Sequence, residues 1–202
     1  VSALNNLIQA VHKKPCSLNS ETESGGAIRS AEIFDPVSGQ WKTTTPSSYD
    51  HIYHTATLLD DGRVLVVGTT VSAPRDFLPQ VEINQPTTDR WYSAASLTST
   101  GRIMHQALRL DDGTVLICGG IGTNGAAVRD CDSYDPATDL WLVRHAMVVP
   151  RLGHTLNLLP NGDVLSVGGA TQFDDATSNP ITTTHKSTEL YSSRSDESSP
   201  PL

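Results

Sequence analysis

The chain has 202 residues, enough for a substantial hydrophobic core, and its 14 lysine and arginine residues face 22 aspartate and glutamate residues. The resulting net charge of −8 argues against binding nucleic acid or an anionic membrane surface, because both require a basic face. No apolar run approaches the ~20 residues of a membrane-spanning helix. Since the chain begins at Val1 without a charged-then-apolar leader, we expect a processed or excerpted segment.

Residues 1–27 differ in character from the rest of the chain. Leu4, Leu7, Ile8 and Val11 keep helical spacing, and two lysines and a proline then favour the end of a helix. The segment suits a short amphipathic helix, and it equally suits a degenerate copy of the repeat that begins near residue 28. Both interpretations stay open.

From residue 28 onward, three sequence elements recur at intervals of about fifty residues. One is a tryptophan five residues after a proline, another is a histidine before a turn, and the third is an apolar run that ends in glycine. They include Trp41, Trp91 and Trp141; His54, His105 and His154; and the pairs Gly119-Gly120 and Gly168-Gly169. Three features that keep one period indicate a stacked or radial array of repeats.

One complete repeat predicts four short antiparallel strands. Asp111-Asp112-Gly113 suits a hairpin turn, and the continuous apolar run after it is typical of a strand covered on both faces. The Asp135-Pro136 dipeptide stops a later strand, because proline cannot donate to a sheet. The strands are expected over Arg102–Leu110, Val115–Cys118 and Val128–Tyr134, with a fourth opening at Trp141.

The order Arg-x-x-His, then Leu-x-Asp-Gly-x-Val-Leu-x-x-Gly-Gly, then Tyr-Asp-Pro-x-Thr-x-x-Trp resembles a kelch repeat. The wording of Leu58–Gly68 is similar to units of bacterial and secreted kelch proteins, including the propeller of galactose-oxidase-like enzymes. This resemblance implies an all-β, kelch-type β-propeller and slightly favours an extracytoplasmic or secreted location. The first full unit departs from the pattern at Thr69, Asn84 and Gln85.

The strand count predicts about three and a half four-stranded blades. Since propellers have four to eight blades, we expect a part of a larger ring. Alternatively, another chain supplies the missing blades, or residues 1–27 hide degenerate strands. The expected units are a partial blade at 28–41, full blades at 42–91 and 92–141, a blade without its fourth strand at 142–191, and a disordered Ser/Pro-rich tail at 192–202.

The recurring tryptophans and histidines are interpreted as scaffold. Tryptophan is large enough to fill the wedge between neighbouring blades. His51 and His54 lie three apart on an expected strand and so point to opposite faces, which excludes one shared metal ion unless the strand has a bulge. Cys118 and Cys131 flank a loop, and either a disulfide or two buried thiols fits them.

No catalytic motif is identified. The sequence lacks the Gly-x-Ser-x-Gly, His-Glu-x-x-His and phosphate-loop patterns, and its five tyrosines do not match the copper motif of galactose-oxidase-like enzymes. We therefore assign no catalytic residue, cofactor or metal ligand.

Two long, non-repeating loops form the candidate binding surface, because loops differ most between propellers and carry binding. They are Thr69–Gln80 and Ala170–Lys186, which are expected on the same side as Ile121–Ala127. Phe77 and Phe173 suit partner anchors, or rings that pack on their own blade. The candidate binding residues are Arg75, Asp76, Phe77, Asn124, Gln172, Phe173, Asp174, Asp175 and His185.

The function that the sequence favours is a non-catalytic binding module for a protein or glycan partner. One alternative is an excerpt of a secreted galactose-oxidase-like copper enzyme. Another is a structural subunit that completes a propeller with a neighbouring chain.

Overall fold

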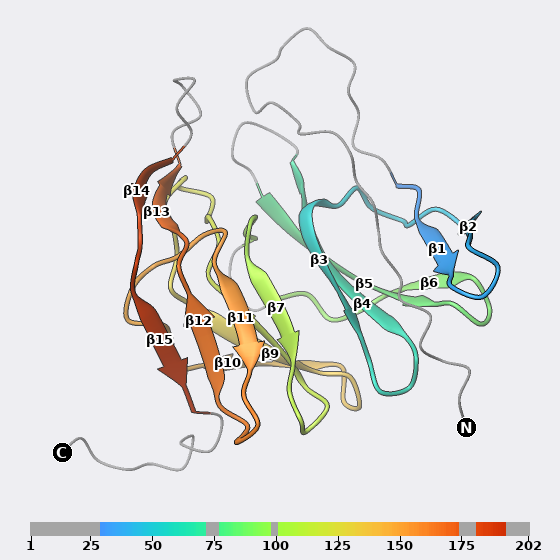
Figure 1. The fold of residues 1–202 in the computed structure, drawn as a ribbon. Coiled ribbons are helices and arrows are strands. Elements are labelled where there is room, and N and C mark those ends of the chain that lie inside the picture. Colours follow the sequence, from blue (N-terminus) through green and yellow to red (C-terminus); the bar gives the residue numbers. More distant parts are fainter. Residues whose placement is uncertain (1–28, 72–76, 98–100, 174–180, 193–202) are drawn as a thin grey trace, which may run out of the picture.

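The structure, a computed structural model, describes residues 29–71, 77–97, 101–173 and 181–192 (Figure 1). All regular elements within these ranges are β-strands, and every strand pairing is antiparallel. The predicted all-β class is therefore confirmed. The segment 1–27 and nearly all of the tail at 192–202 lie outside the described residues, and the described part contains no helix able to cross a membrane.

The strands follow one another with short connections at most positions. In chain order they are β1 (Glu32–Asp35), β2 (Gln40–Thr43), β3 (Ile52–Leu58), β4 (Val64–Val71), β5 (Phe77–Gln85), β6 (Arg90–Ser93), β7 (Gln106–Arg109), β8 (Val115–Cys118), β9 (Cys131–Asp135), β10 (Leu140–Arg144), β11 (Thr155–Leu158), β12 (Val164–Val167), β13 (Ala170–Phe173), β14 (Ile181–Thr184) and β15 (Thr188–Tyr191).

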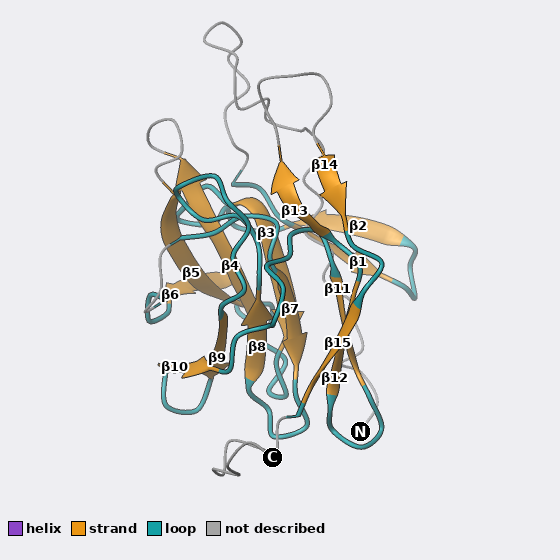
Figure 2. Cartoon of the chain, turned by 90° about the vertical axis from the view of Figure 1, so that its left-hand side faces the viewer, coloured by secondary structure: helices purple, strands orange, loops and turns teal. Residues whose placement is uncertain are grey.

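These strands form separate sheets that lie side by side (Figures 1 and 2). Two sheets have four strands, β3-β4-β5-β6 and β7-β8-β9-β10, and each is built from consecutive hairpins. The strands β11-β12-β15 form a three-stranded sheet, and β1-β2 and β13-β14 form two-stranded ones. The first strands of neighbouring sheets are adjacent, since β7 lies next to both β3 and β11. No described sheet closes on itself.

Local chemistry explains the recurring turns. Asp35 ends β1 and Asp135 ends β9, and these two strands have equivalent positions in the repeat. The Oδ1 atom of each aspartate accepts a hydrogen bond from the backbone N–H two residues later, at 2.9 Å. The tight turn then needs a residue with positive φ, which is Gly39, Asp89 or Asp139 in successive units. Glycine and aspartate tolerate this left-handed backbone best, so the turn residues follow from the turn geometry.

The core consists of clusters between the sheets. Strand β8 shows why: Val115 and Ile117 belong to the cluster shared with β4 and β5, whereas Leu116 and Cys118 belong to the cluster shared with β12. All four side chains are buried, because successive residues of a strand point to opposite faces and both faces are covered. The continuous apolar run Val115–Cys118 therefore forms a strand covered on both faces, as predicted from the sequence.

Several predicted boundaries are wrong. Strand β7 begins at Gln106 rather than Arg102, because Met104 has φ +56° and breaks the extended backbone. Its counterparts in the other units, Tyr53 and Gly153, also have positive φ. The third strand of the same unit begins at Cys131 rather than Val128, since the preceding residues turn to contact the next unit.

The two predicted long loops are largely hairpins. Strand β4 continues to Val71 and pairs with β5 from Phe77, so most of Thr69–Gln80 is strand. Within Ala170–Lys186, β13 and β14 form an additional two-stranded sheet. Sequence patterns mark these segments as loops because they interrupt the repeat, but threonine and valine favour extended backbone and pair readily.

Candidate functional site

The hairpin β4–β5 and the hairpin β13–β14 extend toward the same end of the molecule (Figure 1). The connection Ile121–Ala127 between β8 and β9 has the same place in its sheet. We call this end, comprising residues 69–71, 77–80, 121–127, 170–173 and 181–186, the loop end. The turns of the hairpins β3–β4, β7–β8 and β11–β12, which contain Gly62, Gly113 and Gly162, lie at the opposite end, which we call the turn end (Figure 1).

The predicted binding residues differ in their exposure and in the elements to which they belong. Asn124 is exposed in the connection Ile121–Ala127, and its Oδ1 atom accepts a hydrogen bond from the Ala126 N–H at 3.0 Å. His185 is half-buried, its N–H donates to the Gly169 carbonyl at 2.8 Å, and its buried Nε2 atom contacts no hydrogen-bond partner among the described residues. Asn124 therefore shapes its own turn, whereas His185 lies beside the second glycine pair.

The remaining predicted binding residues lie in strands or outside the described part. Phe77 opens β5, and Gln172 and Phe173 belong to β13, so these three are strand residues rather than loop residues. The others lie outside the described residues, and their roles stay predictions. They are Arg75, Asp76, Asp174 and Asp175.

A buried acid–base pair, which the sequence analysis missed, recurs in the units at 42–91, 92–141 and 142–191. The acid lies in the third strand, and the base lies three residues before the recurring histidine. Burying one charge alone would be costly, so each member requires the other. The pairs are His51 with Glu82 at 2.9 Å, Arg102 with Asp132, and Arg151 with Glu189 at 2.9 Å. The acid always stands two residues before the recurring aromatic position, and that constant spacing is the signal that could have revealed it.

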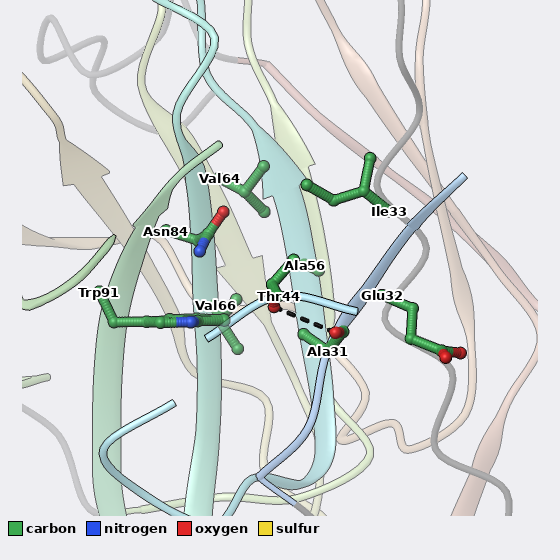
Figure 3. A pocket seen from close by; sticks show the side chains of 9 residues that line it. All are labelled: Ala31, Glu32, Ile33, Thr44, Ala56, Val64, Val66, Asn84 and Trp91. Carbon is green, nitrogen blue, oxygen red and sulfur yellow. Dashed lines mark hydrogen bonds between the residues drawn. The ribbon is translucent and has the colours of Figure 1, made fainter. Parts of the chain in front are cut away.

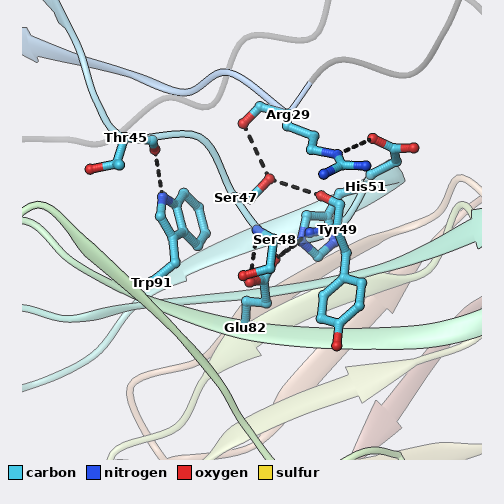
Figure 4. Close-up of polar contacts among 9 residues, drawn as sticks. Arg29, Thr45, Ser47, Ser48, Tyr49, His51, Glu82 and Trp91 are labelled. Atoms are coloured by element: carbon cyan, nitrogen blue, oxygen red, sulfur yellow. Dashed lines mark hydrogen bonds and ion pairs between the residues drawn. The ribbon is translucent and has the colours of Figure 1, made fainter.

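Glu82 shows how the carboxylate is held (Figure 4). Burial acts to raise its pKa, but hydrogen bonds from the His51 side chain and from Ser48 and the Tyr49 N–H outweigh burial and leave the pKa below its usual range. Glu189 has the same environment, because it accepts from the N–H groups of Val148 and Val149. Glu82 and Glu189 therefore each fasten the linker that enters their unit to the third strand of that unit.

His105 and His154 are buried, and both side chains are electrically neutral near pH 7. Burial, reinforced by the nearby Arg102 guanidinium, lowers the pKa of His105 to about 3. Burial and Arg151 lower the pKa of His154 to about 4. The Nε2 atom of His105 lies 3.0 Å from Thr55 Oγ1 of the neighbouring sheet. The described residues contain no group of three or more His, Cys, Asp or Glu placed to hold a metal ion.

The pair His51 and His54 has the bulge that a shared ligand set would require, because the register of β3 shifts between Ile52 and Thr55. Their ring centroids lie 6.1 Å apart. However, the Nε2 atom of His51 is bonded to Glu82, so its function is the buried pair described above.

The Gly-Gly pair allows two units to approach closely. A Cβ atom on Gly119 would lie 2.4 Å from the Arg151 carbonyl oxygen of the next unit, and one on Gly120 would lie 2.5 Å from the Ile103 carbonyl oxygen. Both distances are shorter than any real Cβ contact, so only glycine fits. At the second of these positions the first full unit carries Thr69, which is fully buried and bonds to the Leu78 carbonyl.

A disulfide joins Cys118 in β8 to Cys131 in β9. The two residues are directly opposite in the register of these strands, with a Cα–Cα distance of 4.2 Å. Both also face the cluster between this sheet and the next. The disulfide therefore fastens the second and third strands of one sheet.

Comparison with known proteins gives a partial match. Alpha-scruin of Limulus polyphemus, a kelch-repeat protein, is 26% identical over 118 residues. The match includes 55% of this chain but 12% of alpha-scruin, so the chain spans a small part of that protein's length. No protein-family model matches the chain.

Proposed function

We propose that the chain is a section of a kelch-type β-propeller and that it binds a protein partner through its loop end. The antiparallel four-stranded sheets, their constant period and the similarity to alpha-scruin support the propeller arrangement. The observation that carries the binding role is that, among the described residues, the hairpins β4–β5 and β13–β14 extend toward the same end of the molecule (Figure 1). A rigid scaffold with projecting hairpins is the usual design of a binding surface.

The proposal is restricted to a protein partner. No contact among the described residues favours a glycan ligand or a copper centre. An alternative function is that of a structural subunit, whose partner is a neighbouring chain that completes the ring.

Site-specific photocrosslinking tests the loop end. A photoreactive amino acid is introduced at Thr123 or Lys186 of the loop end, and at Asp112 or Asn161 of the turn end, all of which are exposed. We expect one protein to be crosslinked from both loop-end positions and from neither turn-end position. Equal crosslinking from all four positions would overturn the proposal.

A further inference from the structure

The disulfide lies where the strand pairing between β8 and β9 ends. Cys118–Cys131 is the last pair in the register of these two strands. Beyond it, the backbone continues as Gly119-Gly120 on one side and as residues 128–130 on the other. Both continuations form hydrogen bonds with the linker that leads into the next unit. The disulfide is therefore directly beside the contact between two units.

Three backbone hydrogen bonds connect these continuations to the linker. The Met147 N–H donates to the Arg129 carbonyl at 2.9 Å. The Arg151 N–H donates to the Val128 carbonyl at 3.2 Å, and the Gly120 N–H donates to the Arg151 carbonyl at 2.7 Å. We call this set of three hydrogen bonds the joint. It connects the unit at 92–141 to the unit at 142–191.

The repeat does not require a disulfide at this pair. The equivalent pair is Val67–Val81 in the unit at 42–91 and Val167–Thr188 in the unit at 142–191, and both pairs are in register. The pairing of β4 with β5 continues beyond its valine pair to the end of β4, so main-chain hydrogen bonds hold those strand ends together. In β8–β9 the pairing stops at the two cysteines. The disulfide is therefore an added bond at the place where the strand pairing ends.

An equivalent contact two repeats earlier contains no sulfur. The Ser47 N–H donates to the Arg29 carbonyl at 3.0 Å, and this bond is the counterpart of the first hydrogen bond of the joint. Ala31 has the place of Cys131, and Figure 3 shows it beside Thr44, whose Oγ1 atom donates to the Ala31 carbonyl at 3.0 Å. This contact is therefore an internal reference, in which a reductant has no bond to break.

The two sulfur atoms are shielded from solvent by the packing around the joint. Cys118 is 2% exposed and Cys131 is 1% exposed, and both belong to one apolar cluster with Met147. The Cys131 Sγ atom lies 4.0 Å from the Arg129 carbonyl oxygen, which is an acceptor of the joint. A thiol therefore reaches the S–S bond when the joint opens, and breaking that bond frees the segment that carries the acceptor. Opening of the joint and reduction of the disulfide favour each other.

We propose that the disulfide Cys118–Cys131 is a redox-sensitive switch of the joint and that its reductant is a small-molecule thiol. A thiolate attacks one cysteine sulfur, the S–S bond breaks, and the other cysteine leaves as a thiolate that takes up a proton. A second thiol then displaces the first, which yields two cysteine thiols and the disulfide form of the reductant. Both electrons come from the two small thiols. The proposal does not depend on the partner binding proposed for the loop end.

Amide hydrogen exchange, followed by NMR, tests the switch in the Cys16→Ser chain, which keeps only the two cysteines of the disulfide. Addition of 2-mercaptoethanol should accelerate exchange of the Met147 and Arg151 amides by about tenfold or more, because their acceptors are released. Exchange of the Ser47 amide, in the reference contact, should change by less than about twofold. Equal acceleration at all three amides would mean that reduction destabilises the whole chain, and it would overturn the proposal.

The variant Cys118→Val, Cys131→Val separates the covalent bond from the packing of the two side chains. It reproduces the Val67–Val81 pair of the unit at 42–91, so we expect it to fold. The amides of its joint should exchange as fast as those of the reduced chain, with or without 2-mercaptoethanol. Exchange as slow as in the oxidised chain would show that packing alone holds the joint, and the proposal would be wrong.

A switch must also be reversible under conditions in which the chain stays folded. Removal of 2-mercaptoethanol and addition of its disulfide form should restore slow exchange at Met147 and Arg151. Alkylation of free thiols followed by mass spectrometry measures how much of the disulfide is present at each step. If the folded chain is not reduced at millimolar thiol, or if reoxidation does not restore slow exchange, the proposal fails.

Discussion

At the residue scale, the buried histidines make stability depend on pH. The pKa of His154 is about 4 in the folded chain, below the ordinary value of 6.5, so the folded state resists protonation that the unfolded state accepts. Stability is therefore complete above pH 6.5 and is lost as the pH falls toward 4, by up to about 1.4 kcal/mol per pH unit for this one proton. His105 acts in the same direction down to a pH of about 3.

The His154→Asn variant tests this dependence. The free energy of unfolding, measured with urea at intervals between pH 4.5 and 7, should fall less steeply with decreasing pH than in the unmodified chain. The flattening should reach about 1.4 kcal/mol per pH unit. Parallel curves for the two proteins would show that His154 does not cause the dependence.

The buried acid–base pairs make a second residue-scale prediction. Glu189→Gln removes the charge that faces the fully buried Arg151, so the free energy of unfolding should fall by about 3 kcal/mol. Asp61→Asn, beside the partly exposed Arg63, is the matched control and should cost under about 1 kcal/mol. Urea denaturation of both variants measures the difference, and equal losses would contradict a structural role for the buried pair.

At the scale of the element, the disulfide fastens the hairpin β8–β9. It closes a short loop with a sequence separation of 13 residues, and constraining the unfolded chain in this way stabilises by about 3 kcal/mol. The double variant Cys118→Ser, Cys131→Ser should lose about that amount in urea denaturation. Reduction should lower the unmodified chain to the stability of the variant, whereas Cys16→Ser should behave as the unmodified chain. No response to the reductant would contradict the prediction.

At the scale of the whole molecule, stability resides in the interfaces between sheets. Trp141 is 7% exposed in such an interface, whereas Trp41 is 45% exposed in the two-stranded sheet. Trp141→Ala should therefore lower the free energy of unfolding by roughly 3–5 kcal/mol. Trp41→Ala is the matched control and should cost much less. Similar losses in chemical denaturation would mean that the two tryptophans have equivalent surroundings.

The sequence by itself determined the all-β class, the antiparallel hairpins and the positions of the turns. These features depend on local chemistry: aspartate binds the backbone of its own turn, glycine accepts positive φ, and apolar runs form strands. The fifty-residue period then identified equivalent residues without any coordinates. The pair Gly119-Gly120 indicated a close approach of another backbone segment, but the sequence did not identify that segment.

Only the tertiary structure decided which partners those residues meet. Glu82 and His51 are 31 residues apart in sequence, and nothing local shows that one neutralises the other. The strands β13 and β14 are not part of the repeat, so the repeat pattern did not predict them. The unequal exposure of Trp41 and Trp141 depends on whether a neighbouring sheet supplies the opposing surface. These features depend on packing between segments that are distant in sequence. The same local motif therefore has different surroundings in different units.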